Sequence, residues 1–265
     1  MQRYHPSARG AEFLLTLDQI YDRLREVSPG PTPQTTDRRG AGAQLKKPRI
    51  FKEHELAHAL LDGLTGLEVG AAAHNPFGLR TRNVAPQEGH EFYADFQWRE
   101  MGADPARVAI WAYADSIPVP DASEDFVISS HVLEHLPNVI ATFIEWDRIV
   151  RDGGYVFMIA PLKGVVSENA SRELTTLAHF VEDYHHRMTL DSHPTEGVPG
   201  ERMGVYHTFT PDSLLEVVEW MRIARLCDWE MVAREDIDSK VGNGFTLAFR
   251  VRHQQPSPNR VIQPR

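Results

Sequence analysis

The chain has 265 residues, of which 42% are hydrophobic and 25% are charged, and it contains one cysteine, Cys227. Such a chain can bury a sizeable core, and a single cysteine excludes a disulfide scaffold and a cysteine-rich zinc finger. The formal net charge of −9 argues against nucleic acid as the main partner, because phosphate binding requires clustered Lys and Arg. No apolar run reaches the length of about 18 residues that a membrane helix needs, and the N-terminus is polar. We therefore expect no membrane contact and a cytoplasmic location.

Residues 1–50 are expected to form a helix and a flexible linker or lid. Apolar residues recur at three- and four-residue spacing from Phe13 to Val27, which is typical of an amphipathic helix. Residues 31–47 are rich in Pro, Thr, Gly and Arg and have almost no apolar side chain, which indicates a flexible connection. We expect the main domain to span residues 51–252, and the tail at residues 253–265 to be loose.

Between these ends, strand-like and helix-like segments alternate. Strands are predicted at residues 67–69, 108–113, 126–130, 155–160, 229–234 and 245–251, and helices at residues 56–64, 138–150, 174–184 and from Thr210 onward. Thr210 is the expected cap of the last helix, with Pro211 in its first turn. The alternation predicts an α/β fold with a doubly wound, mostly parallel sheet and helices on both faces. Ligands of such sheets bind at the carboxyl ends of the strands.

The sharpest local feature is the segment GLEVGAAAHNPFG, which begins at Gly66. An apolar strand ends in Glu68 and Gly70, and the small residues Ala71 and Ala72 follow. Small residues allow a ligand to approach the backbone closely, and the carboxylate can accept hydrogen bonds from a cation or a hydroxyl. The segment lacks the G-x-G-x-x-G pattern, so it does not favour a nicotinamide oxidoreductase or a P-loop protein.

Four segments in the same order resemble the class I S-adenosylmethionine-dependent methyltransferases of the type 11 group. They are GLEVGAAAHNPFG from Gly66, ADSIPVPD from Ala114, EDFVISSHVLEHL from Glu124 and IVRDGGY from Ile149. The resemblance covers about residues 64–251. It implies a Rossmann-like sheet of seven strands, methyltransferase activity, S-adenosylmethionine as the cofactor, and an insertion at about residues 162–209 that covers the substrate.

The resemblance also implies a set of cofactor-binding residues. Glu68 would orient the ligand at its amino-acid end, Asp115 would read the adenine amino group, and Ser130 would lie near the sulfonium. The whole implied set is Glu68, Gly70, Ala71, Ala72, Asn75, Asp115, Ser116, Ser130 and His131.

Two departures from the family pattern stand out. Ala72 and His74 replace the second and third glycines of the first motif. Asn83 stands where the family has an acidic residue for the ribose hydroxyls, so Asn83 or a residue near Gln97 would have to substitute. These departures favour one alternative, a non-catalytic partner subunit that keeps a degenerate pocket.

Two histidines after the predicted strand at residues 126–130 are the catalytic candidates. Methyl transfer is an in-line displacement that mainly requires a well-positioned nucleophile, and a hydroxyl nucleophile also needs a base, a role that histidine can fill. His131 and His135 are four positions apart with Glu134 between them, and we expect both on the first helical turn. We favour His135 as the general base and His131 as its alternative or as a cofactor contact. A purely structural role for His135 stays open.

A second cluster of histidines and acids falls in the expected insertion. Its members are His179, Asp183, His185, His186, Asp191, His193, Glu196, Glu201, Tyr206 and His207. The run YHTFTP from Tyr206 resembles an element of bacterial sugar-modifying methyltransferases, and we assign His185, His186, Tyr206 and His207 to substrate binding. The cluster could also hold a divalent metal such as Mg²⁺, although no H-E-x-x-H spacing occurs. The alternative is a solvated loop with scattered histidines.

The leading hypothesis is therefore a methyltransferase of a particular kind. It would be an S-adenosylmethionine-dependent O-methyltransferase for a hydroxyl of a sugar, oligosaccharide or glycosylated metabolite, a role that suits polysaccharide biosynthesis. N- or C-methylation of another small natural product is a second enzyme hypothesis. A homodimer is a further expectation.

Overall fold

The computed structural model describes residues 53–71, 77–88, 90, 91, 94, 98, 106–165, 172–193 and 204–253. The helix and linker expected at residues 1–50 lie outside the described residues, as does the tail from residue 254 onward. The same holds for His74 and for two residues of the implied cofactor set, Ala72 and Asn75.

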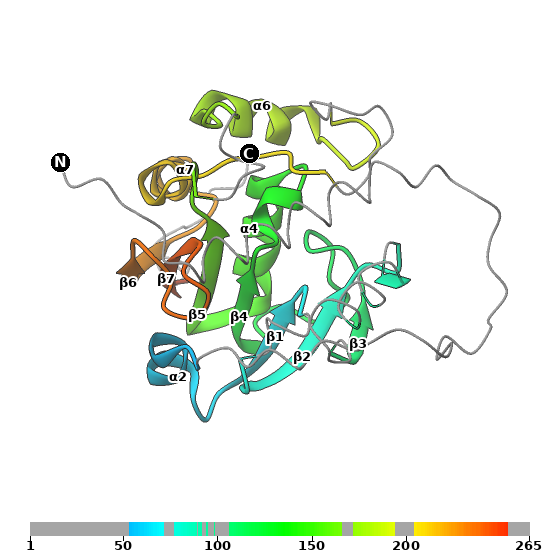
Figure 1. Cartoon of the computed structure of the whole chain (residues 1–265), viewed down its shortest axis with the longest axis vertical. Coiled ribbons are helices and arrows are strands. Elements are labelled where there is room, and N and C mark those ends of the chain that lie inside the picture. The colour runs from blue at the N-terminus through cyan, green and yellow to red at the C-terminus, as the bar shows by residue number, and fades with distance from the viewer. Residues whose placement is uncertain are drawn as a thin grey trace, which may run out of the picture.

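A seven-stranded sheet runs through the middle of the described molecule, in the order β3-β2-β1-β4-β5-β7-β6 (Figure 1). The strands are β1 (Thr65–Val69), β2 (Arg80–Ala85), β3 (Val108–Trp111), β4 (Glu124–Ser130), β5 (Val150–Pro161), β6 (Trp229–Glu235) and β7 (Gly244–Val251). The first five strands are parallel, and β7 is antiparallel to both β5 and β6. The predicted mostly parallel, Rossmann-like sheet is confirmed.

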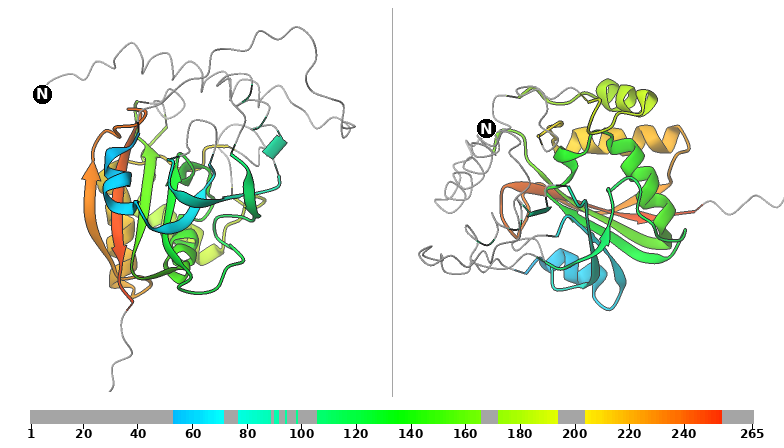
Figure 2. Two further views of the ribbon diagram at one scale, coloured as in Figure 1. Left: turned by 90° about the horizontal axis from the view of Figure 1, so that it is seen from below. Right: turned by 90° about the vertical axis from the view of Figure 1, so that its right-hand side faces the viewer.

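Helices cover both faces of this sheet, as predicted (Figure 2). On one face, Ala57 and Leu61 of α2 (Glu55–Leu61) pack with buried side chains of β4 and β5. On the other face lie α4 (Val139–Ile149) and α7 (Pro211–Ile223), whose apolar residues join the larger core. The helix α6 (Leu177–His186) contacts both α4 and α7 and forms an outer layer. No helix in the described part of the chain is long and apolar enough to cross a membrane.

Side-chain caps fix where the helices begin. Asn138 accepts a hydrogen bond from the Ala141 N–H at 2.9 Å and starts α4. Thr210 and Ser213 form a reciprocal capping box at the start of α7, with Pro211 in the first turn. The predicted start of α7 is confirmed. Because such caps satisfy backbone groups that lack a partner in the helix, each contributes about 1 kcal/mol of stability.

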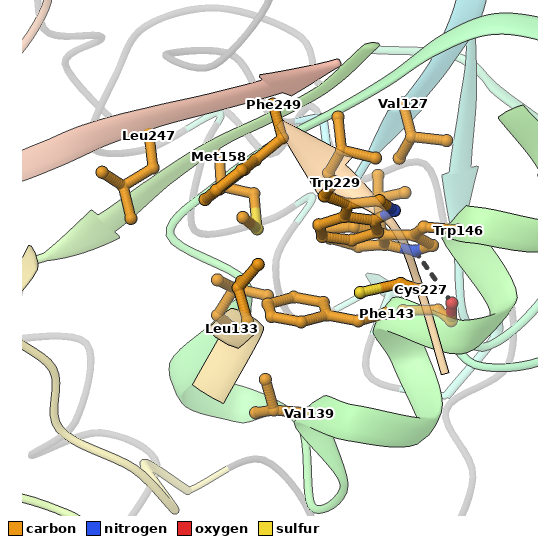
Figure 3. Packing of buried hydrophobic residues seen from close by; sticks show 14 of the residues in the cluster. Val127, Leu133, Val139, Phe143, Trp146, Met158, Cys227, Trp229, Leu247 and Phe249 are labelled. Atoms are coloured by element: carbon orange, nitrogen blue, oxygen red, sulfur yellow. Dashed lines mark hydrogen bonds between the residues drawn. The ribbon is translucent and has the colours of Figure 1, made fainter. Parts of the chain in front are cut away.

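Aromatic residues fill the core between α4 and the strands β6 and β7 (Figure 3). The rings of Phe143 and Trp229 lie 5.3 Å apart, and those of Trp229 and Phe249 lie 5.7 Å apart. Trp146 donates a hydrogen bond to the Ala114 carbonyl at 3.0 Å, so the buried indole keeps its polar partner. This packing fixes the position of α4 against the sheet.

Two strands differ from the sequence prediction. β2 is polar at its start, with Arg80 exposed, and turns inward at Asn83 and Val84, so alternating hydrophobicity gives it little signal. β5 begins at Val150 rather than at residue 155, because an irregularity in its pairing with β4 accommodates the glycines there. At Gly154 an added Cβ would lie 2.5 Å from the Asp125 carbonyl oxygen, so only glycine fits this close approach.

Candidate active site

The carboxyl ends of the parallel strands meet at one edge of the sheet, where ligands of doubly wound folds bind. Val69 of β1 is paired with Val84 of β2 and with Ser129 of β4, so the residues that follow these strands lie side by side. The loop of residues 236–243, between β6 and β7, reaches the same edge because Gly244 of β7 pairs with Pro161 of β5.

The turn after β1 requires glycine. Gly70 has a φ of +72°, and an added Cβ would lie only 2.6 Å from a methyl carbon of Val132. The Gly70 N–H donates to the Val84 carbonyl at 2.8 Å, and the Ala71 N–H donates to Asn83 Oδ1 at 3.0 Å. Hydrogen bonds to β2 thus fix the turn, and the turn lies directly against the residues that follow β4.

Glu68 is the acidic residue at the end of β1, and it is buried. Thr81 donates a hydrogen bond to its Oε2 at 2.9 Å, whereas its Oε1 has no hydrogen-bond partner in the described ranges. Burial raises the pKa of Glu68 to about 7, although the Thr81 hydroxyl opposes the shift. A buried carboxylate oxygen beside a tight glycine turn fits a ligand that brings an ammonium or hydroxyl group, as the amino-acid end of S-adenosylmethionine does.

The end of β2 offers no acid at the expected position. The side chain of Asn83 is already hydrogen-bonded to the protein backbone, because its amide also donates to the carbonyls of Ala71 and Ala106 at 3.3 and 3.4 Å. Glu88, which the sequence analysis did not consider, lies further along and accepts a hydrogen bond from the Tyr113 hydroxyl at 2.8 Å. Glu88 is therefore a carboxylate beyond β2 that contacts the segment after β3. Gln97 lies outside the described residues.

Asp115 and Ser116 follow β3, and both are exposed. Asp115 lines an open cleft of about 430 Å³ between this segment, the start of α4 and the end of α6. The other lining residues are Asn138, Ala141, Tyr184, His185, Arg187, Met188 and Thr189. The cleft is lined by polar and apolar groups in about equal measure, and Asp115, Asn138, Arg187 and Thr189 provide hydrogen-bond donors and acceptors for a ligand with hydroxyl groups.

The residues after β4 form a buried group around one carboxyl. The expected helical turn is a single 3-10 turn, η1 (Leu133–His135), and His131 precedes it with a φ of +53°. The two histidines therefore do not both lie on the first helical turn, which corrects the sequence expectation. They still approach the same atom, because His131 Nδ1 and His135 Nε2 each lie 3.7 Å from Glu134 Oε1.

The protonation states of this group follow from its burial. Burial raises the pKa of Glu134 to about 8 and lowers that of His135 to about 4. His135 is therefore neutral at pH 7. We assign its hydrogen to Nδ1, which lies 3.2 Å from the Gly204 carbonyl oxygen. Nε2 is then the nitrogen with a lone pair, as a general base requires.

Several buried polar atoms at this edge have no hydrogen-bond partner of normal geometry within the described part of the chain. They are Glu68 Oε1, His131 Nε2, Glu134 Oε2 and both amide atoms of Asn243. His131 and Asn243 lie close enough to interact, but no well-formed hydrogen bond joins them. Because leaving such atoms unpaired costs about 1–3 kcal/mol each, they indicate a polar ligand or bound water in front of β1 and β4.

The loop between β6 and β7 was missed by the sequence analysis. Its anchor is Asp238, whose buried carboxylate accepts hydrogen bonds from four backbone N–H groups between Lys240 and Gly244, at 2.8–3.1 Å. This ring of bonds holds Asn243 in place at the edge. The only sequence signal was the Gly- and Asn-rich run DSKVGNG, which indicates a turn.

The insertion brings four of the predicted polar residues together and leaves others apart. Ligand atoms of His179, Asp183, His193 and His207 lie within 4.8 Å of one another. Burial opposes ionisation of Asp183, but hydrogen bonds from His193 and His207 outweigh it and lower its pKa to about 2. Burial lowers the pKa of His207, so its imidazole is neutral.

The proposed substrate residues occupy different places. His207 is fully buried in the four-residue cluster, and Tyr206 is buried with its ring 4.8 Å from that of His193. His185 lines the cleft beside Asp115, whereas His186 is exposed at the end of α6. Of the four, only His185 lies on the surface of a described cleft. Glu196 and Glu201 lie outside the described residues.

Comparisons with known proteins found a family match and similar solved structures. Residues 95–158 match the family model described as a methyltransferase domain. The chain is similar to a solved S-adenosylmethionine-dependent methyltransferase of Aquifex aeolicus, at 18% identity over 76% of this chain and 90% of that one, with a TM-score of 0.42. A solved methyltransferase of Methanosarcina mazei is 14% identical over 77% of this chain and 100% of that one, with a TM-score of 0.46. A structure described as a putative methyltransferase of Listeria monocytogenes is 10% identical over 76% of this chain and 96% of that one, with a TM-score of 0.47. No curated protein sequence matches the chain.

The matched segment contributes strands to the observed sheet. Strands β1–β5 lie within a Rossmann-like order that places Glu68 and Gly70 beside the end of β4. The domain match covers β3 and β4 and most of β5. Within its Rossmann-like fold, the chain therefore contains a segment, residues 95–158, that matches a methyltransferase domain.

Proposed function

We propose that the protein transfers a methyl group to a hydroxyl of a sugar, an oligosaccharide or a glycosylated metabolite, with His135 as the general base. The observation that carries this proposal is the buried group after β4. A neutral His135 that donates through Nδ1 presents its basic nitrogen at the ligand-binding edge, next to Glu134.

Glu68, Gly70 and Ala71 would hold the amino-acid end of S-adenosylmethionine, and Ser130 and His131 would lie near its sulfur. The cofactor supplies an activated methyl group with a good leaving group. Asp115, Ser116, Ala72 and Asn75 stay in the proposed cofactor set on the strength of the family resemblance. Glu88 joins them as a candidate for the ribose hydroxyls, because it is the carboxylate that the structure offers beyond β2.

The task of the chain in this proposal is to align the hydroxyl and to accept its proton. His135 Nε2 would take that proton, and the resulting imidazolium would lie 3.7 Å from Glu134 Oε1. Because burial raises the pKa of Glu134 to about 8, its carboxyl is mostly protonated at pH 7, and an imidazolium beside it would favour the ionised form. The hydrogen bond to Gly204 keeps the ring oriented throughout.

The open cleft beside Asp115 supports an acceptor with many hydroxyl groups. Its lining by Asp115, Asn138, Arg187 and Thr189 provides several hydrogen-bonding groups in one place, a pattern that suits a sugar better than an apolar natural product. The nitrogen-rich cluster of the insertion is a poor match for Mg²⁺, which prefers oxygen ligands. The proposal therefore assigns no catalytic Mg²⁺.

Two measurements test the proposal. Calorimetry with S-adenosylhomocysteine should show saturable binding to one site per chain; absence of binding would support the non-catalytic subunit instead. A screen with methyl-labelled S-adenosylmethionine should then label sugars or glycosides and leave amines unlabelled, without any requirement for added Mg²⁺. Labelling of amines or carbon acceptors alone would reject O-methylation and support the second enzyme hypothesis.

A further inference from the structure

Four side chains that are far apart in sequence point at one spot inside the insertion. His179 and Asp183 lie one turn apart on α6, His193 follows that helix, and His207 precedes α7. His179 Nε2 and His193 Nε2 lie 3.2 Å apart, and His207 Nε2 lies 3.0 Å from Asp183 Oδ2. Asp183 is also 3.4 Å from both His179 Nε2 and His193 Nε2.

Two hydrogen bonds pair the four groups, His179 with His193 and His207 with Asp183, but they leave the 3.4 Å approaches of His179 and His193 to Asp183 unexplained. His179, His193 and Asp183 form a triangle in which each nitrogen is close to both other members. An imidazole Nε2 carries either one hydrogen or one lone pair, so it cannot bond well to two neighbours at once. Lone pairs that converge on one cation would satisfy every member of the cluster together.

The distances fit a tetrahedral metal centre. With metal–nitrogen and metal–oxygen bonds of about 2.0–2.2 Å, neighbouring ligand atoms of a tetrahedral zinc site lie about 3.3–3.5 Å apart. Four of the observed separations are 3.0–3.4 Å, and all the ligand atoms lie within 4.8 Å of one another before any metal is bound. Three imidazoles and one carboxylate are also the donors that zinc prefers, whereas Mg²⁺ and Ca²⁺ prefer oxygen.

We infer that His179, Asp183, His193 and His207 bind one Zn²⁺ ion. The site is closed, because four protein ligands complete the tetrahedron and the side chains of Asp183, His193 and His207 are at most 4% exposed. Closed sites of this kind stabilise structure and leave no position for a substrate. Zinc at this site is therefore a structural ion of the insertion.

The ion also positions the catalytic turn. The segment that carries His207 donates from the Tyr206 N–H to the Glu134 carbonyl at 2.7 Å. Gly204 of the same segment accepts the hydrogen bond from His135 Nδ1. Zinc would therefore tie α6 to the segment that orients His135, and His207 would be a positioning residue that acts through its neighbours.

The test is metal content, which does not depend on any methyl-transfer activity. Untagged full-length protein from zinc-supplemented culture should contain about one zinc per chain by elemental mass spectrometry. Replacement by Co²⁺ should give the intense visible bands of tetrahedral cobalt. Chelation should lower the melting temperature, and added zinc should restore it. Protein that binds neither zinc nor cobalt would overturn the inference, as would an octahedral cobalt spectrum.

Matched variants assign the ligands. Asp183→Asn keeps the size and a carbonyl oxygen at this position but removes the charge, and it should purify with less than about a tenth of the wild-type zinc. His179→Gln affects the half-exposed member, whose side chain is 41% exposed, so the variant should fold and still lose tight zinc binding. His186→Gln on the same helix lies outside the cluster and should keep full zinc content. Equal zinc content in all three variants would contradict the assignment.

Discussion

Two buried polar regions lie on either side of the turn after β4, and they differ in how their atoms are satisfied. At the edge of the sheet, Glu68, Glu134 and Asn243 keep buried atoms without a hydrogen-bond partner among the described residues. In the insertion, the ligand atoms of Asp183 and its three histidines face one another within 4.8 Å. The first arrangement leaves its polar atoms available to a large ligand, and the second can enclose only a small ion.

This difference suggests different roles: the edge of the sheet for catalysis, and the cluster in the insertion for structural stability. Burying polar groups is costly in both regions. In our proposals, molecules that exchange in each reaction cycle complete the edge, whereas a permanently bound ion completes the insertion. The two meet at Glu134, whose carbonyl accepts from Tyr206 and whose carboxyl lies beside His135. Perturbing either region should therefore produce effects that can be told apart.

The largest effect is expected from removing the proposed base. His135→Gln should lower turnover by about 10²–10⁴-fold, the usual contribution of a general base, while S-adenosylhomocysteine binds as before. The measurement is kcat for the acceptor found in the screen, together with calorimetry. His253→Gln is the matched control, because His253 follows β7 at the opposite edge of the sheet and bonds to the Asp147 carbonyl. Wild-type turnover in His135→Gln would assign that histidine a packing role.

The next effect concerns pH and Glu68. Its pKa is raised from 4.5 to about 7 in the folded protein, so the folded state binds more protons than the unfolded state between these values. The free energy of unfolding should therefore fall by about 3 kcal/mol as the pH rises through this window in the cofactor-free protein. Denaturation of wild type and Glu68→Gln at several pH values measures this contribution as their difference. A difference that does not change with pH would contradict the assigned pKa.

Binding of the cofactor should lower the raised pKa of Glu68 again. An ammonium group beside Glu68 favours the carboxylate, so binding of S-adenosylhomocysteine near pH 6.5 should release up to about one proton. Calorimetry in buffers with different ionisation enthalpies counts the released protons. Glu68→Gln should release fewer. Equal release in both proteins would mean that the ligand does not approach this carboxyl.

A smaller effect is expected at the turn itself. Gly70→Ala should destabilise the protein by about 2 kcal/mol, from left-handed backbone strain and the close approach to Val132, and it should weaken cofactor binding. Gly63→Ala is the matched control, because its φ is +82° but no atom lies within 4 Å of the added Cβ. It should lose about 1 kcal/mol of stability and keep cofactor affinity. Equal cofactor affinities in the two variants would show that contact with Val132 is unimportant.

The smallest effect should come from Thr81→Val. This change removes the hydrogen bond to Glu68 Oε2 at a cost of about 1 kcal/mol. Because that bond opposes the raised pKa of Glu68, the pH-dependent fall in stability should move to higher pH. The same denaturation series provides the measurement. A curve that coincides with that of the wild type would exclude a role for Thr81 in setting this pKa.

Local patterns in the sequence were sufficient to predict most of the strands and helices of the fold. Apolar runs of strand length located β4, β5 and β7, and Thr210 with Pro211 located the start of α7, because burial and capping depend on residues close together in the chain. The turn at Gly70 was equally visible, since a glycine after an apolar strand and an acid is a local signal. Even the two histidines after β4 could be found in this way, although not their geometry.

Only the tertiary structure decided which polar atoms meet. The left-handed backbone of His131 and the approach of Asn243 depend on contacts between strands that periodicity does not reveal. His193 and His207 reach His179 and Asp183 from 14 and 24 positions away, and the sequence offered ten candidates in that region with no means of choosing four. Sequence periodicity reports which face of an element is buried, whereas a metal or proton-transfer site depends on distances of about 3 Å between atoms of different elements.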